Sequence, residues 1–134
     1  MTKLDSIEGI GPVYAEKLGG AGIQSTEALL EKGATKKGRS SLAESTGISE
    51  QLLLTWINHA DLYRIKGIGS EYSELLEASG VDTVMELARR NAGNLYAKMA
   101  EVNGEKNLCR QLPSANAVGD WVEQAKKLPR VLEY

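Results

Sequence analysis

The chain carries one sequence pattern twice, 58 residues apart, and this repeat restricts its fold more than any other feature. The stretch that begins at Leu4 aligns without a gap with the stretch that begins at Leu62. At the centre of each copy two glycines flank an isoleucine, in Gly9-Ile10-Gly11 and Gly67-Ile68-Gly69. A tyrosine and a leucine follow at helical spacing, so each copy predicts a tight turn that leads directly into a helix. We call residues 7–11 and 65–69 the first and second glycine turns.

Apolar residues between and after these turns recur at helical spacing, and alternating strand patterns are nearly absent. The stripe Leu53, Trp56, Ile57 and Ala60 predicts a long helix near 50–65 that closes the first repeat and opens the second. We therefore expect an all-α fold of tandem repeats, residues 1–61 and 62–134, packed as one compact pseudo-symmetric domain of about nine or ten short helices.

Weaker signals complete the expected order of elements. Ser25 or Thr26, then Ser49 and Thr83, are predicted to cap helices. Residues 35–39 form an expected basic turn before a short helix, residues 91–94 an expected break, and residues 103–104 an expected turn. The stretch 105–112 has no counterpart in the first repeat and is predicted to be helical. The tail 130–134 is expected to be extended or docked.

Composition excludes several classes of protein. The 134 residues contain one cysteine and one histidine, so neither a disulfide framework nor a Cys/His metal cage is expected. No apolar run approaches the roughly 18 residues that span a bilayer, and a cytoplasmic location is the simplest expectation. No nucleophile motif or phosphate loop is present, which favours a non-enzyme without a cofactor. The net charge of −2 requires any nucleic-acid contact to be local.

The pattern Ile-x-Gly-Ile-Gly-x-x-Tyr-x-x-x-Leu-x-x-x-Gly-Ile resembles the helix-hairpin-helix signature, and the whole chain is similar to an uncharacterised bacterial family of tandem helix-hairpin-helix proteins. In DNA-binding relatives the amides after the second glycine hold a backbone phosphate without regard to base sequence. Here the resemblance implies the amides of Gly11, Val13 and Tyr14, and those of Gly69, Glu71 and Tyr72. Some relatives also hold a monovalent cation on turn carbonyls. Those carbonyls correspond to Asp5, Ile7 and Ile10, or to Tyr63, Ile65 and Ile68.

The two copies differ in the charges that surround them. Lys17 follows the first turn, and the basic stretch Lys36, Lys37 and Arg39 is a further candidate for phosphate contact beside it. Lys66 precedes the second turn, but three glutamates, Glu71, Glu74 and Glu77, lie along the helix after it, which makes the second copy the weaker DNA candidate. The candidate nucleic-acid-binding residues are Gly9, Gly11, Val13, Tyr14, Lys17, Lys36, Lys37, Arg39, Lys66, Gly67 and Gly69.

Two functions follow from this pattern. The first is a DNA- or RNA-binding module that contacts backbone phosphates. The second is a protein-interaction adaptor in which both glycine turns are purely structural, with a partner surface around residues 105–112 or 131–134. The Gly-Ile-Gly motif favours the two about equally, since close packing of two helices requires the same glycines. The oligomeric state is left open.

Overall fold

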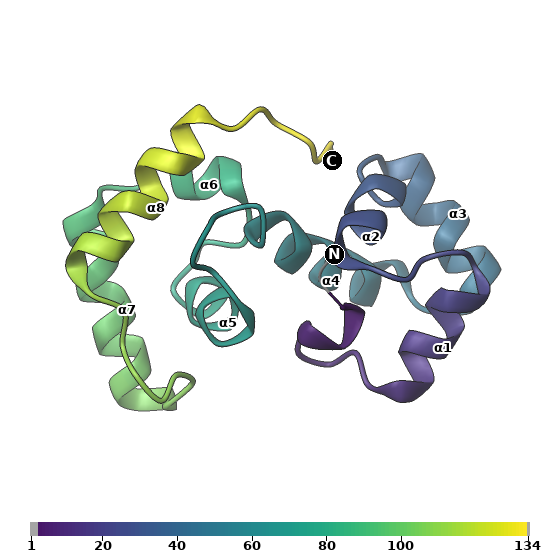
Figure 1. Cartoon of the computed structure of the whole chain (residues 1–134), viewed down its shortest axis with the longest axis horizontal. Helices are drawn as coiled ribbons and strands as arrows, with labels where there is room; N and C mark the ends of the chain where they lie inside the picture. The colour runs from purple at the N-terminus through teal and green to yellow at the C-terminus, as the bar shows by residue number, and fades with distance from the viewer. Residues whose placement is uncertain (1–2, 134) are drawn as a thin grey trace. The chain divides into compact units, whose positions relative to one another are not determined.

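The computed structural model describes residues 3–133, in which every regular element is a helix and a single isolated bridge joins Lys3 to Ser25 (Figure 1). The all-α prediction is confirmed. A 3-10 turn, η1 (Leu4–Ser6), precedes eight α-helices within these residues. They are α1 (Pro12–Gly20), α2 (Thr26–Lys32), α3 (Lys36–Thr46), α4 (Glu50–Leu62), α5 (Ser70–Ala78), α6 (Val84–Ala88), α7 (Ala92–Lys106) and α8 (Ala115–Lys127). None of the helices in 3–133 is long and apolar enough to cross a bilayer.

The helices pack into two compact units. The described part of the first unit comprises residues 3–61 together with 131–133, and the second unit is Leu62–Arg130. The chain therefore leaves the first unit after Asp61 and returns to it at Val131. As a result, the second unit is joined covalently to the first at both of its ends.

Each unit has a core built around one tryptophan. In the first unit the predicted stripe of α4 is buried, with Leu53, Trp56 and Ile57 almost fully excluded from solvent. In the second unit Trp121 and Val122 of α8 lie in a cluster of buried residues drawn from α5, α6 and α7 as well. Burial of such side chains supplies most of the free energy that holds short helices together.

Each glycine turn lies against the tryptophan of its own unit. Gly9 has a φ of +95° and Gly67 a φ of +103°, values that side chains other than glycine rarely adopt. A Cβ atom at Gly9 would lie 3.2 Å from the Trp56 indole nitrogen, and one at Gly67 would lie 2.9 Å from that of Trp121. The first glycine of each turn is therefore required for both backbone conformation and close packing.

Local capping signals in the sequence are confirmed. The Ser25 hydroxyl accepts the Ala28 amide at 3.1 Å, and the Thr83 hydroxyl accepts the Glu86 amide at 3.2 Å. At the start of α4 the Leu52 amide donates to the Ser49 hydroxyl at 3.1 Å. Each bond supplies a partner for one of the amides that a helix leaves open in its first turn.

Four other local predictions are wrong. The Thr35 hydroxyl accepts the Gly38 amide at 3.0 Å, so residues 36–39 form the first turn of α3 and not a loop before it. The helix α7 begins directly after Asn91 and continues through Asn103-Gly104, because its apolar face is buried against the second unit's core. Residues 107–114, most of the predicted inserted helix, are non-helical.

The side chain of Asn103 shapes this loop. Its Oδ1 accepts the Cys109 amide at 2.8 Å, and its Nδ2 donates to the Cys109 carbonyl at 3.2 Å. Asn107, with a φ of +53°, ends α7. The Asn103 side chain thus supplies hydrogen-bond partners for the main-chain N–H and C=O of Cys109, which in a helix would pair with other main-chain groups.

Candidate nucleic-acid interface

Two α-helices in the described chain begin without a side-chain cap, and both follow a glycine turn. Gly11 precedes α1 and Gly69 precedes α5, and neither helix start receives a hydrogen bond from a capping side chain. The other six α-helices are each capped by a side-chain oxygen. The capping residues are Ser25, Thr35, Ser49, Thr83, Asn91 and Ser114. The first-turn amides of α1 and α5 therefore have no side-chain cap, and the helix dipole favours an anion at such a position.

The start of α1 is open. A Cβ at Gly11 would meet nothing within 4 Å, and Val13 is 65% exposed. The first turn of α1 contains no acidic residue. Tyr14 packs edge-on against Trp56 with ring centroids 5.0 Å apart, and the Lys17 ammonium lies 5.8 Å from the centre of the Tyr14 ring. This contact holds a positive charge one turn beyond the uncapped amides.

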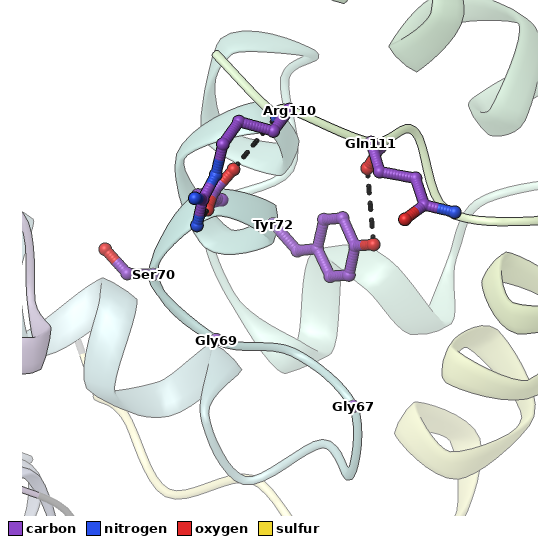
Figure 2. Close-up of a pocket in the computed structure, with 7 residues that line it drawn as sticks. Gly67, Gly69, Ser70, Tyr72, Arg110 and Gln111 are labelled. Atoms are coloured by element: carbon purple, nitrogen blue, oxygen red, sulfur yellow. Dashed lines mark hydrogen bonds and ion pairs between the residues drawn. The ribbon is translucent and has the colours of Figure 1, made fainter.

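The start of α5 carries a negative charge of its own. Figure 2 shows Arg110 and Gln111, from the loop after α7, beside Tyr72 of α5. The Glu71 carboxylate, in the first turn of α5, accepts the Arg110 amide at 3.0 Å and the Arg110 guanidinium at 3.1 Å. The bond from the Arg110 main-chain N–H, and then the guanidinium, hold the pKa of Glu71 below its ordinary range.

An open pocket of about 630 Å³ lies beside this ion pair, within the second unit. Its lining residues are Gly67, Gly69, Ser70, Glu71, Tyr72, Arg110 and Gln111. The Tyr72 hydroxyl donates to the Gln111 carbonyl at 3.3 Å. The Glu71 carboxylate, paired with Arg110, thus lines the same pocket as the start of α5. The lower ranking of the second turn as a DNA site stays a prediction.

The backbone of the second turn is also clamped by a residue that the sequence did not single out. The Lys66 amide donates to Gln124 Oε1 at 2.9 Å, and Gln124 Nε2 donates to the Lys66 carbonyl at 3.1 Å. The Lys66 side chain remains exposed. Trp121 matches Trp56 at an offset of 65 residues, so the same offset aligns Gln124 with His59 and could have indicated a role for this position.

The basic stretch of α3 does not flank the first glycine turn. In Figure 1 α3 begins beside the C-terminal segment, whereas α1 begins at the far end of the same unit. Lys36 and Lys37 are exposed there, but Arg39 is only 4% exposed. Its guanidinium donates to main-chain carbonyls of the first unit, including that of Gly33 at 2.8 Å. Arg39 is therefore a buried structural residue, contrary to its placement in a surface basic turn.

Cys109 is buried next to the second turn. Its thiol donates to the Glu71 carbonyl at 3.3 Å. Burial, and then the negative charges of Glu71 and Glu74, raise the pKa of the Cys109 thiol to about 11. A thiol with so high a pKa is a poor nucleophile at neutral pH.

Among residues 3–133 no group of three or more His, Cys, Asp or Glu side chains is arranged to hold a metal ion. Of the carbonyls proposed for a monovalent cation, those of Ile7, Ile10, Ile65 and Ile68 lie in the two glycine turns, and those of Asp5 and Tyr63 precede them. Those of Ile7 and Ile65 accept the amides of Ile10 and Ile68, each at 3.2 Å, which closes both turns in the same way.

Comparison with known proteins identifies a family. No curated protein and no solved structure matches the chain. The family described as "Domain of unknown function (DUF4332)" matches residues 8–128, which include residues 8–11 of the first glycine turn, the whole second turn and all eight α-helices of the described chain. The chain belongs to the family of the domain of unknown function DUF4332.

Proposed function

We propose that this protein is a non-enzymatic module that binds the phosphate backbone of nucleic acid, DNA in the first instance, through the first glycine turn. The observation that carries this proposal is the open start of α1, where uncapped amides follow the bare Gly11 and the first helical turn contains no acidic residue. We infer that the two turns are helix-hairpin-helix elements, of which the first binds and the second is structural. Backbone amides recognise a phosphate whatever base it carries, so the binding is independent of sequence.

The charges around α1 set the expected strength of binding. Lys17 is the nearest cation that the structure places on this surface, while Glu8 and Glu16 are also exposed. A site with so few cations neutralises one or two phosphates, so binding is weak. Each neutralised phosphate of duplex DNA contributes about −0.9 to the slope of log affinity against log salt.

The experiment uses a matched pair of substitutions in the full chain. Gly11→Asp places a capping carboxylate on the α1 amides and a negative charge where the phosphate would lie. Gly69→Asp makes the same change at α5. Both glycines have extended backbone angles compatible with a capping aspartate, and a Cβ meets nothing within 4 Å at either position. We expect each variant to retain its stability or gain a few tenths of a kcal/mol.

Fluorescence anisotropy with a labelled duplex at low salt measures the outcome. Wild-type chain and Gly69→Asp should bind the duplex equally. Gly11→Asp should lose at least about tenfold in affinity, because the new carboxylate takes the α1 amides away from the phosphate as hydrogen-bond partners. Lys17→Glu should weaken binding and flatten the salt slope. No binding by the wild-type chain, or equal losses in the two aspartate variants, would refute the proposed site and favour the adaptor function.

A further inference from the structure

The C-terminal segment Val131–Glu133, which has no regular secondary structure, docks on the first unit through its main chain. The Glu133 amide donates to the Ala34 carbonyl at 2.7 Å, and the Glu133 carbonyl accepts Arg39 Nη2 at 2.7 Å. Leu132 is only 3% exposed. The contacts that hold the segment thus include a backbone hydrogen bond, a bond to a guanidinium and a buried apolar side chain.

Arg39 recognises main chain on both sides of this contact. Its Nη1 donates to the carbonyls of Gly33 at 2.8 Å and Ala34 at 3.3 Å, while its Nη2 reaches Glu133. One buried guanidinium therefore bridges the loop between α2 and α3 to the docked segment. Main-chain carbonyls carry no side-chain identity, so this contact accepts an extended peptide of almost any sequence.

The receiving surface is built from local contacts that do not involve the segment. A Cβ at Gly33 would lie 2.1 Å from the Ile57 Cδ1 atom, which shows how closely the α2–α3 loop packs on α4. The Cβ of an alanine at position 38 would lie 2.2 Å from the Lys32 carbonyl, so α2 and α3 are equally close there. These contacts predict that the groove keeps its form when the segment leaves.

We propose that the groove formed by Gly33, Ala34 and Arg39 is a docking site for extended polypeptide, and that the chain's own segment Val131–Glu133 occupies it as a detachable latch. The segment follows Pro129 and lies outside any helix, so it can open without melting α8. When the segment has left the groove, residues 3–61 remain joined to the second unit through the peptide bond between Asp61 and Leu62. The latch is independent of phosphate binding at α1.

The first experiment supplies the segment in trans. Leu132→Asp in the full chain removes the apolar anchor and should open the latch while helical circular dichroism is unchanged. A fluorescent peptide with the sequence of residues 128–134 should then bind this variant saturably, and bind wild-type chain at least about tenfold more weakly because the tethered segment competes. Adding Arg39→Lys to Leu132→Asp should abolish peptide binding. Adding Lys37→Ala to Leu132→Asp, at an exposed position of the same helix, should leave peptide binding unchanged.

A helical Leu132→Asp chain that fails to bind the peptide would overturn the proposal, and so would binding that survives Arg39→Lys. If Leu132→Asp unfolds the chain, hydrogen exchange of the wild-type chain decides. A detachable latch requires the Glu133 amide to exchange through local opening, at least about tenfold faster than the amide of the buried Leu53. Equal rates, governed by global unfolding, would show that the segment is a permanent part of the first unit.

Discussion

Replacing Gly67 by alanine tests whether the tryptophan packing of the second glycine turn demands glycine. At a φ of +103° an alanine costs about 1–2 kcal/mol in backbone energy. Its Cβ would also lie 2.9 Å from the Trp121 indole nitrogen, and a buried ring cannot move aside freely. Overpacking of this kind costs about 1–3 kcal/mol, so we expect a total loss of about 2–5 kcal/mol in the free energy of unfolding. Gly9→Ala, with a contact of 3.2 Å to Trp56, should lose somewhat less.

Urea denaturation followed by tryptophan fluorescence measures both losses, because each unit contains one tryptophan. Gly69→Ala is the matched control. Its φ of −115° suits any residue, and its Cβ would meet nothing within 4 Å, so its stability should stay within about 0.5 kcal/mol of wild type. Equal stabilities of Gly67→Ala and Gly69→Ala would refute the reasoning from conformation and contact.

Three further measurements address single contacts. Gly33→Ala should lower the free energy of unfolding in urea by about 1–3 kcal/mol, because the added Cβ would overlap the buried Ile57 side chain. A variant as stable as wild type would contradict this. Cys109 should react slowly with an aromatic disulfide reagent below its pKa of about 11, and quickly in denaturant. The buried neutral thiol contributes fully to the free energy of unfolding below the ordinary thiol pKa, and this contribution is lost as pH rises through about 11. The contacts that lower the pKa of Glu71 stabilise the fold above the ordinary glutamate pKa, and this stabilisation is lost as pH falls through the lowered pKa of the folded chain. Carboxyl NMR titration should show the lowered pKa, and Arg110→Ala should reverse the shift only in part, because the variant keeps the main-chain N–H that is its larger cause.

The helices and the glycine turns could be predicted from sequence because their signals are local. The 58-residue repeat located both turns, and Ser25, Ser49 and Thr83 were recognisable as caps since each bonds an amide three residues away. The buried stripe of α4 followed from helical spacing. The glutamates after the second turn also ranked it below the first as a candidate DNA site. In the structure the Glu71 carboxylate lies at the start of α5, bonded to Arg110.

Only the tertiary structure decided which residues meet across the chain. Arg39 is part of a basic stretch in the sequence, yet it is buried on main-chain carbonyls, one of them 94 residues away. Asn103 and Gly104 carry turn signals, but packing of the α7 face outweighs a helix propensity cost of about 1 kcal/mol for the glycine. Arg110 meets Glu71 because a loop, and not a helix, follows α7. Local preferences are worth tenths of a kcal/mol to about one, whereas burial of a core face is worth several, so burial prevails wherever the two conflict.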